Sequence, residues 1–379
     1  MSEPKVIRKN SAEPVLSAYL HAKGIAQGIA VSGSFELTSR CNFNCKMCYV
    51  HSAENQKALI EKELTADQWL GIASDARNAG MLFLLLTGGE PFLREDFTKI
   101  YEELIKMGIM VSINTNASLY NEEIRDTFRK YPPARINVSL YGGSEETYRS
   151  LCGNASYEKV IRNLNSMKDD HLPVRLNVTL TPYNIQDMTE IDRISKDIGL
   201  HVKATTYMYP PIRINGSVGN NPARFDAEEA GKLMAVWDCL RETDEQFKIR
   251  KEKMCTAQMR EDADFGSTVK REGVTCRAGR SSFWITWDGE MLPCGMMSGA
   301  PVNVLEKGFV DAWERIRKLT GEILLPPECA VCNMRNRCSI CAAISQAETG
   351  SFETKPEYIC RLTKARCEET IRLADERGL

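Results

Sequence analysis

Residues 34–48 read Ser-Phe-Glu-Leu-Thr-Ser-Arg-Cys-Asn-Phe-Asn-Cys-Lys-Met-Cys, a short predicted strand followed by a loop with three cysteines. The spacing of Cys41, Cys45 and Cys48 is C-x3-C-x2-C, which can supply three thiolates to a four-iron cubane. Iron–sulfur clusters are normally held by four cysteines, so a set of three leaves one iron open to a ligand from outside the protein. We therefore expect a site of chemistry at this loop rather than a simple electron-transfer centre.

The same three cysteines could instead bind zinc or be buried thiols. A structural zinc site needs four protein ligands, and His51 is the one nearby candidate for the fourth. The iron–sulfur interpretation is the better one.

Short β-rich runs alternate with helical patterns between about Ser34 and Pro210, which predicts parallel βαβ units. The predicted strands are Ser34–Leu37, Leu82–Leu86, Met110–Asn114, Ile136–Leu140, Val174–Leu180 and His201–Thr206. The predicted helices lie near Thr65–Asn78, Glu95–Lys106, Asn121–Arg129, Tyr157–Lys168 and Asp187–Ile198, with Thr65 and Asn121 as N-caps. Because polar motifs follow successive strands at their carboxyl ends, we predict an α/β fold with a partial (β/α)6 TIM barrel.

The chain changes character after the barrel pattern. A helix is predicted near Asp226–Glu242, and the highly charged stretch Lys248–Thr275 is interpreted as a solvated connector. A hairpin over Ser282–Pro293 turns at Asp288-Gly289, a helix follows at Phe309–Leu319, and a terminal helix begins at about Thr363. We expect an N-terminal extension (1–33), a barrel (34–245), a bridging segment (246–275) and a cysteine-rich domain (276–379).

The composition argues against several classes of protein. The 379 residues carry 49 basic and 51 acidic side chains, a formal net charge of −2, which provides no basic footprint for nucleic acid. No apolar run approaches the roughly 18 residues of a membrane span. The segment Met1–Asn10 is charged, so no secretory signal is expected and we predict a cytoplasmic protein.

The second motif is Thr87-Gly88-Gly89-Glu90-Pro91, at the end of the second predicted strand. Two glycines let a backbone approach a ligand closely, and a glutamate can accept hydrogen bonds from an ammonium group. The turn alone is a weak signal, but together with a three-cysteine loop one strand earlier it is highly specific.

With both motifs, the segment from Ser34 to about Tyr209 resembles the radical S-adenosylmethionine (SAM) enzymes. The resemblance implies that Cys41, Cys45 and Cys48 bind a four-iron cluster whose open iron is chelated by SAM. One electron then cleaves SAM to methionine and a 5′-deoxyadenosyl radical, which takes a hydrogen atom from the substrate. The residues implied to contact SAM are Tyr49, Gly88, Gly89, Glu90, Pro91, Asn114, Ser139 and Asn177.

One departure from the family pattern concerns the turn after the fourth strand. Relatives commonly carry an Arg-Gly pair there, but this chain has Cys152-Gly153, with Arg149 three residues earlier. The group that binds the SAM carboxylate is therefore left open. Cys152 itself is a weak candidate for a catalytic hydrogen donor.

A dense set of cysteines follows the barrel pattern, and in a reducing compartment such clusters bind metal more often than they form disulfides. Its members are Cys276, Cys294, Cys329, Cys332, Cys338, Cys341 and Cys360. Cys329-x2-Cys332-x5-Cys338-x2-Cys341 alone could be a zinc knuckle, but that leaves three cysteines unexplained.

The full set resembles the SPASM domain of radical enzymes that modify peptides, except that two residues, not three, separate Cys338 from Cys341. This resemblance implies a distal auxiliary four-iron cluster held by Cys329, Cys332, Cys338 and Cys360, and a proximal one held by Cys276, Cys294 and Cys341. The proximal cluster lacks an obvious fourth thiolate, so we expect either an open ligand position or ligation by Cys255.

The resemblance implies a cofactor set of three four-iron clusters and SAM. It also implies hydrogen abstraction from a residue of a peptide or small protein, ending in a thioether or carbon–carbon cross-link, an oxidation or an epimerisation. The expected partners are that substrate, an electron donor such as flavodoxin or ferredoxin, and a separate leader-recognition protein, because only about 33 residues precede the first strand.

Three alternatives stay open. The first is an anaerobic sulfatase-maturing enzyme, although Gly295 follows Cys294 where those relatives have an aspartate, and Val50 replaces a common aromatic residue. The second is a radical enzyme acting on a small metabolite. The third belongs to another class, a zinc-binding interaction module, which the barrel pattern and the Gly88–Pro91 turn disfavour.

Overall fold

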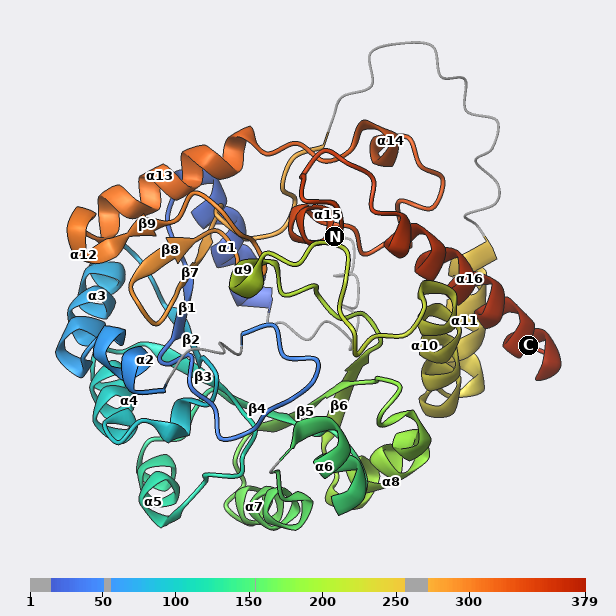
Figure 1. Cartoon of the computed structure of the whole chain (residues 1–379), viewed down its shortest axis with the longest axis horizontal. Helices are drawn as coiled ribbons and strands as arrows, with labels where there is room; N and C mark the ends of the chain where they lie inside the picture. Colours follow the sequence, from blue (N-terminus) through green and yellow to red (C-terminus); the bar gives the residue numbers. More distant parts are fainter. Residues whose placement is uncertain (1–14, 51–55, 154, 256–271) are drawn as a thin grey trace, which may run out of the picture.

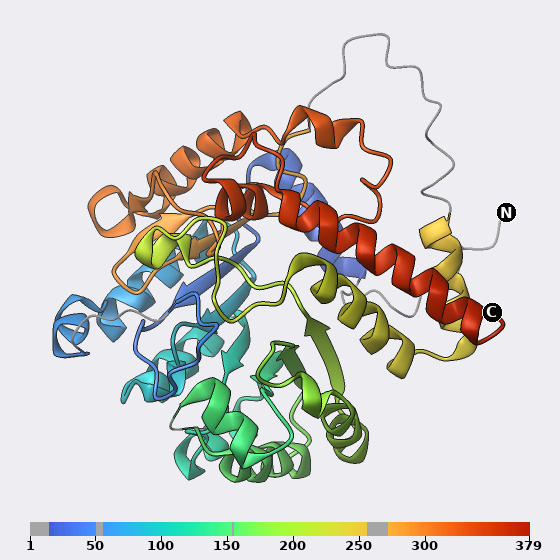
Figure 2. The same ribbon diagram turned by 45° about the vertical axis from the view of Figure 1, so that its right-hand side comes forward.

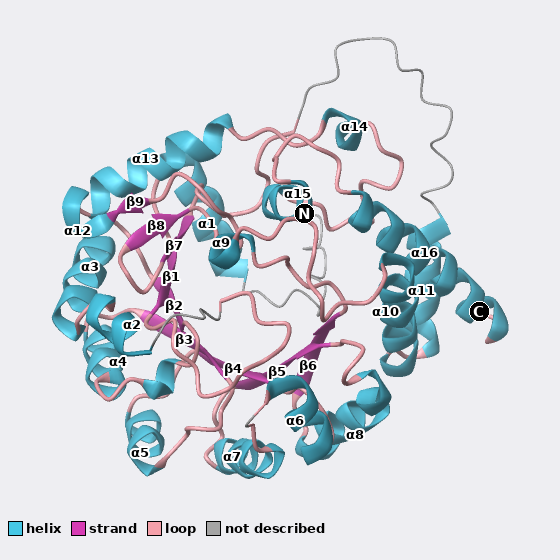
Figure 3. Ribbon diagram, viewed as in Figure 1, coloured by secondary structure: helices cyan, strands magenta, loops and turns pink. Residues whose placement is uncertain are grey.

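The computed structural model describes residues 15–50, 56–153, 155–255 and 272–379. Its centre is one nine-stranded sheet with the order β6-β5-β4-β3-β2-β1-β7-β8-β9. The sheet curves into an incomplete barrel (Figures 1 and 3), which confirms the predicted α/β fold with a partial (β/α)6 barrel.

The first six strands are parallel and lie side by side in chain order. They are β1 (Ser32–Glu36), β2 (Phe83–Thr87), β3 (Met110–Thr115), β4 (Arg135–Ser139), β5 (Val174–Thr179) and β6 (His201–Thr205). Since parallel strands end at the same edge, every loop that follows one of them opens at one mouth of the barrel.

The last three strands extend the same sheet on its other side. β7 (Ser282–Ile285) pairs parallel with β1, and β8 (Glu290–Leu292) and β9 (Val302–Asn303) follow in antiparallel order. The hairpin predicted over Ser282–Pro293 is confirmed, and its turn has Gly289 at a φ of 89°, a left-handed conformation that favours glycine. The sheet therefore runs through the boundary predicted at residue 276.

The barrel strands differ on their two faces. Alternate residues such as Ile136, Val138, Leu176 and Val178 are fully or almost fully buried in the main core, which also includes helix residues. The residues between them are polar and only partly buried, and they include Asn137, Ser139 and Asn177. Strands of parallel sheets are usually apolar on both faces, but here the inner face is polar because it lines the space under the mouth.

The connecting helices cover the outer face of the barrel (Figures 1 and 3). They are α2 (Gln56–Lys62), α3 (Ala66–Asn78), α4 (Phe97–Lys106), α5 (Glu122–Lys130), α6 (Glu145–Cys152), α7 (Tyr157–Asp169) and α8 (Met188–Ile198), with short 3-10 turns at Pro91–Leu93 and Ile185–Asp187. Thr65 and Asn121 cap α3 and α5 as predicted, and Thr65 forms a capping box with Gln68.

The remaining helices lie before and after the barrel. They are α1 (Val15–Gln27), α9 (Ile212–Asn215), α10 (Ala227–Arg241), α11 (Asp244–Cys255), α12 (Val304–Lys307), α13 (Phe309–Glu322), α14 (Pro327–Ala330), α15 (Ala342–Thr349) and α16 (Glu357–Glu376). Helix α16 packs lengthwise against α10 and α11, as Figure 2 shows. None of the described helices combines the length and the apolar character that crossing a membrane requires.

The structure adds to or corrects the helical predictions in three ways. The terminal helix begins at Glu357 rather than near Thr363, so Cys360 lies within it. The charged stretch Lys248–Thr275 was interpreted as a connector. Its first part, up to Cys255, belongs to helix α11, and residues 256–271 lie outside the described residues. Helices α1, α6 and α15 were not predicted; α1 and α15 have low amphipathic contrast, because small or apolar residues occur on several of their faces.

Candidate metal and cofactor site

The cysteine loop follows β1 at the mouth of the barrel, and backbone hydrogen bonds hold it on two sides. The Gly89 amide donates to the Thr38 carbonyl at 2.7 Å, and the Glu90 amide donates to the Arg40 carbonyl at 2.9 Å. On the other side, the amides of Asn44 and Lys46 donate to the carbonyls of Cys152 and Leu151 at 3.0 and 2.9 Å. The chain itself therefore sets the shape of the loop.

The two glycines of the second motif are needed for contact with the protein's own backbone, whereas we expected contact with a ligand. A Cβ on Gly88 would lie 2.3 Å from the Thr38 carbonyl oxygen, and one on Gly89 would lie 2.1 Å from the Arg40 carbonyl oxygen. Gly88 also has a φ of 145°. The close approach that needs glycine is thus to the backbone of the cysteine loop, which locks the two motifs together.

Glu90 is fully buried and its carboxylate already accepts three hydrogen bonds from the chain. Its donors are the Phe92 amide at 3.1 Å, the Thr115 hydroxyl at 2.7 Å and the Asn116 amide at 2.7 Å. Burial raises the pKa of this carboxyl to about 7, although the three donors oppose the shift. Its structural role is to tie the turn after β2 to the end of β3.

Asn116 is a site residue that the sequence reasoning missed. Its side-chain amide lies 3.8 Å from the Cys41 Sγ and donates to the Asn42 Oδ1 at 3.0 Å. Asn114, which was predicted instead, accepts from the Asn137 side chain at 2.8 Å, deeper in the barrel. Asn116 lies two residues beyond Asn114, directly after the end of β3, where its partners belong to the cysteine loop.

The three loop thiols are partly buried and lie close enough to influence one another. Burial, with smaller contributions from Glu90, Cys45 and Cys48, raises the pKa of Cys41 to about 12. Cys48 also lies near Tyr49, whose pKa is raised by burial and by Glu36. Thiols held this way are neutral without a metal, and iron binding would replace their protons.

Cys152 is fully buried at the end of α6, directly beside the cysteine loop. Contact with the Cys152 thiol and burial both raise the pKa of Cys45. The backbone carbonyl of Cys152 accepts a hydrogen bond from the Asn44 amide, so the Cys152-Gly153 pair supports the loop. The structure thus gives Cys152 a contact with a predicted ligand, and its role as a hydrogen donor stays a prediction.

The other predicted SAM contacts lie around the same mouth. Ser139 is at the end of β4 directly opposite Asn177 on β5, and its hydroxyl interacts with the Tyr141 phenol. Tyr141 in turn lies near Cys45 and Cys48, so this polar face of the barrel meets the cysteine loop. Tyr49 is partly buried and lies near Glu36 and Cys48.

A buried ion pair closes the other side of the mouth, and sequence reasoning missed it. Arg213 on α9 donates through both terminal nitrogens to Glu36, the last residue of β1. Arg213 also lies near the buried thiol of Cys294, where its positive charge partly offsets the rise in pKa that burial causes. Helix α9 therefore connects the barrel with the cysteines of the C-terminal region; a four-residue helix after a Pro-Pro pair gave no periodic signal.

The structure brings Cys276, Cys294 and Cys341 together. Burial raises the pKa of Cys294 to about 11, with Cys341 and Cys276 as further causes. The Tyr209 phenol interacts with Cys341, and Tyr209 packs against both Cys294 and Cys341 in one small core. Three thiols and a phenol thus meet beside the barrel mouth.

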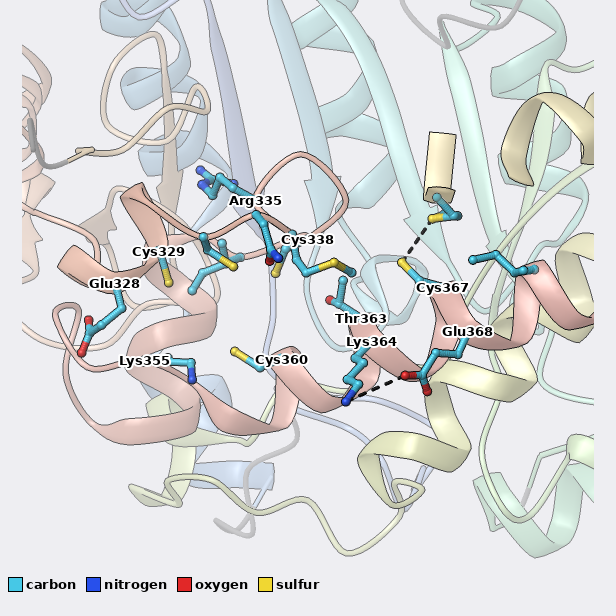
Figure 4. A pocket seen from close by; sticks show the side chains of 16 residues that line it. Glu328, Cys329, Arg335, Cys338, Lys355, Cys360, Thr363, Lys364, Cys367 and Glu368 are labelled. Atoms are coloured by element: carbon cyan, nitrogen blue, oxygen red, sulfur yellow. Dashed lines mark hydrogen bonds and ion pairs between the residues drawn. The ribbon is translucent and has the colours of Figure 1, made fainter. Parts of the chain in front are cut away.

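The other four cysteines of the C-terminal set surround one cavity of about 380 Å³. Cys329, Cys332 and Cys338 come from the loop around α14, and Cys360 comes from α16. Figure 4 shows the sulfurs of Cys329, Cys338 and Cys360 on neighbouring walls. The four cysteines therefore line one cavity, and their role as cluster ligands stays a prediction.

Within the part of the chain that the structure describes, no three His, Cys, Asp or Glu side chains are close enough to hold one metal ion. A cubane separates its four thiolates more widely than one ion does, because each thiolate binds a different iron. The donor sets and the cavity around Cys329 fit a cluster. His51, the candidate for a fourth zinc ligand, lies outside the described residues.

Comparisons with known proteins agree with this site. Residues 35–194, which include both motifs, match the model of the Radical SAM superfamily. This part of the chain is therefore a radical SAM domain, and proteins with this domain use a four-iron cluster with SAM. The AdoMet-dependent heme synthase of Methanosarcina barkeri is 26% identical over 345 residues, which cover 86% of this chain and 96% of that protein.

Other relatives match only part of their length. A probable GTP 3′,8-cyclase of Saccharolobus islandicus is 34% identical over 170 residues. The match covers 44% of this chain and 53% of that protein, so the chain spans about half the length of this relative.

Solved structures of low identity share the fold across almost the whole chain. SuiB of Streptococcus suis bound to S-adenosylmethionine has a TM-score of 0.64 at 14% identity, covering 93% of this chain and 83% of that one. The anSMEcpe structure with bound AdoMet has a TM-score of 0.62 at 15% identity, covering 91% and 99%. The likeness extends beyond the barrel into the cysteine-rich region.

Proposed function

We propose that this radical SAM enzyme abstracts hydrogen from a residue of a peptide or small protein that enters the open barrel. The observation that supports the proposal is the arrangement of groups at the mouth of the barrel. A three-cysteine loop is fixed there by the Gly88–Glu90 turn and by the end of α6, above a polar inner face. A four-iron cluster and SAM, when bound at this loop, supply the 5′-deoxyadenosyl radical.

The chain's own residues would position the cofactor. Cys41, Cys45 and Cys48 would hold the cluster, and the Asn116 amide beside Cys41 would stabilise its thiolate. Because Glu90 is occupied by three donors, we assign it to positioning and assign the backbone of Gly88–Pro91 to the SAM ammonium group. Tyr49, Asn114, Ser139 and Asn177 would complete the pocket.

We assign the two C-terminal sites to auxiliary four-iron clusters, in a SPASM domain. The distal cluster would occupy the cavity of Cys329, Cys332, Cys338 and Cys360. The proximal cluster would bind Cys276, Cys294 and Cys341, with a fourth position left for a substrate donor. Such clusters would accept the electron that remains after hydrogen abstraction.

Two solved relatives of the same fold support a peptide or small protein as the substrate. SuiB has been solved with a precursor peptide, SuiA, and anSMEcpe with a peptide named Cp18Cys. We further propose a flavodoxin or ferredoxin as electron donor, a separate leader-recognition protein and a cytoplasmic location. A sulfatase-maturing role is less favoured, because Gly295 packs directly against the Trp284 ring, where an aspartate would not fit.

A small metabolite is the second candidate substrate. It is favoured by the heme synthase of Methanosarcina barkeri, because that match runs through both halves of the chain. A metabolite would have to be recognised by the inner face of the barrel alone.

Anaerobic reconstitution tests the proposal. We expect reductant-dependent formation of 5′-deoxyadenosine from SAM. In a peptide encoded beside the enzyme we expect a loss of two hydrogens or, for an epimerisation, the uptake of one deuterium when the reaction is run in D2O. Absence of 5′-deoxyadenosine would contradict radical chemistry, whereas its formation with no change in any peptide would favour the metabolite.

A further inference from the structure

The inner face of the barrel carries a group of basic side chains far from the cysteine loop. Arg135 is the first residue of β4, Arg175 the second of β5, and Lys203 the third of β6. These positions alternate with Ile136, Leu176 and Val202, which belong to the core on the outer face. All three cations therefore belong to the inner face.

The strand registers bring these cations next to one another. Arg175 lies opposite His201 on β6 and opposite Asn137 on β4, and Lys203 lies opposite Asn177. Burial and the neighbouring Arg135 lower the pKa of Arg175. Burial lowers the pKa of His201 as well, and the charge of Arg175 adds to this effect. The charge of Arg135 on β4 thus acts on Arg175 on β5, and the charge of Arg175 acts on His201 on β6.

Within the described residues, no carboxylate forms an ion pair with these three cations. None of the ion pairs or hydrogen bonds found among residues 15–50, 56–153, 155–255 and 272–379 involves the side chain of Arg135, Arg175 or Lys203. Asp192, on the neighbouring helix α8, is paired with Arg241 and Lys196. Arg135 and Arg175 are partly buried and Lys203 is exposed, so a group of like charges without an opposing carboxylate is accessible here and attracts a ligand of opposite charge.

We propose that Arg135, Arg175 and Lys203 bind carboxylate groups of the substrate, below the site of hydrogen abstraction. This inference rests on the proposed function, because it places the substrate in the barrel. Guanidinium groups bind carboxylates through paired hydrogen bonds, and Asn177 adds an amide donor on the same face. The carboxylates belong either to the acidic side chains of a peptide or to a carboxylated small molecule.

Equilibrium binding to the reconstituted holoenzyme tests the inference with two probes. Haem, which carries two propionates, represents the small molecule, and a hexaglutamate peptide represents the acidic peptide. We expect at least one probe to bind wild type in a salt-dependent manner, and Arg175→Gln/Lys203→Gln to weaken it by about tenfold or more. The probe that binds identifies the source of the carboxylates.

Two further variants separate charge from folding. Arg175→Lys/Lys203→Arg keeps both charges and is expected to keep most of the binding. Lys159→Gln/Lys168→Gln removes the same charge from exposed positions on the outer helix α7 and is expected to bind as wild type does. Unchanged binding in Arg175→Gln/Lys203→Gln, equal loss in the α7 control, or no binding of either probe to wild type would overturn the inference.

The same preparation distinguishes this inference from the proposed function. Formation of 5′-deoxyadenosine by wild type supports radical chemistry whatever the binding result is. Carboxylate binding without 5′-deoxyadenosine would overturn the proposed function and leave the inner-face site standing.

Discussion

The loop of Cys41, Cys45 and Cys48 and the cavity of Cys329, Cys332, Cys338 and Cys360 differ in how the protein holds them. Four backbone hydrogen bonds from two neighbouring segments fix the loop. The four cysteines of the cavity line an open space of about 380 Å³, and Cys332 is exposed. The loop is therefore shaped by the fold, whereas we expect the cavity to depend on its proposed cluster for order.

This difference follows from what each site has to do. A site that makes a radical must place SAM in one geometry, and preformed backbone contacts provide it without the metal. A site that only transfers electrons needs four thiolates within reach, and metal binding itself can supply the folding energy. We expect the two regions to respond differently to substitution and to metal removal.

The largest expected effect is on catalysis. Replacing Cys41, Cys45 and Cys48 together with alanine should abolish 5′-deoxyadenosine formation, because no cluster remains to bind SAM. Chromatography with mass spectrometry measures the product. Replacing Cys239, a buried thiol outside both sites, with alanine is the matched control and should retain activity. Residual cleavage of SAM by the triple variant would contradict the assignment of the SAM-binding cluster to this loop.

A smaller but still large effect is expected for Gly89→Ala. Its Cβ would lie 2.1 Å from the Arg40 carbonyl oxygen, so the turn and the loop must separate. We expect a loss of about 2–4 kcal/mol in the free energy of unfolding, as for other overpacked positions, together with loss of the loop cluster.

Gly71→Ala is the control for this substitution. Gly71 lies in α3, and a Cβ there meets nothing within 4 Å. An alanine in a helix is expected to stabilise the protein by about 0.5–1 kcal/mol. Denaturant unfolding followed by circular dichroism measures both variants, and equal stability of the two would show that the close contact does not hold the loop.

Metal removal should separate the two regions next. After chelation we expect protease cleavage to increase around Cys329–Cys341, because the cavity loses the cluster that orders it. The loop around Cys45 should stay protected, since its backbone hydrogen bonds do not need metal. Limited proteolysis with mass spectrometry locates the cuts. Equal exposure of both segments would contradict the proposed difference.

The smallest expected effect concerns pH. Burial raises the pKa of Glu90 to about 7, above its ordinary value near 4.5, so the folded protein keeps this proton where the unfolded chain has lost it. Stability should therefore fall as the pH rises between those two values, by up to about 3 kcal/mol. Thermal unfolding of metal-free protein measures the slope, and Glu90→Gln should flatten it. A slope that Glu90→Gln leaves unchanged would show that another group is responsible.

Much of the barrel could be predicted because strand, helix and turn signals agree along it. The two motifs were found from spacing alone, and the cap residues Thr65 and Asn121 were placed correctly. The reason for the two glycines was not predictable, because the atoms that a Cβ would meet belong to a loop fifty residues earlier in the chain. Asn116 and Arg213 were missed for the same reason, since their partners are distant in the sequence.

The sequence also did not predict that one continuous sheet joins the barrel and the C-terminal region. Sequence reasoning placed a new domain at residue 276, but β7 pairs with β1 and joins the C-terminal region to the barrel. Pairing between strands so distant in sequence leaves no periodic pattern. The consequence is that the proximal cysteines lie beside the mouth, where Tyr209 and Arg213 connect the two regions.

The central claim is that one chain holds a radical-generating cluster and two auxiliary clusters at separate sites. Iron analysis of the anaerobically reconstituted protein, with Mössbauer spectroscopy, tests it most directly. We predict about twelve irons per chain in wild type and about eight in either the Cys41/Cys45/Cys48→Ala variant or the Cys329/Cys332/Cys338/Cys360→Ala variant. About four irons in wild type, or zinc at the C-terminal cysteines, would contradict the claim.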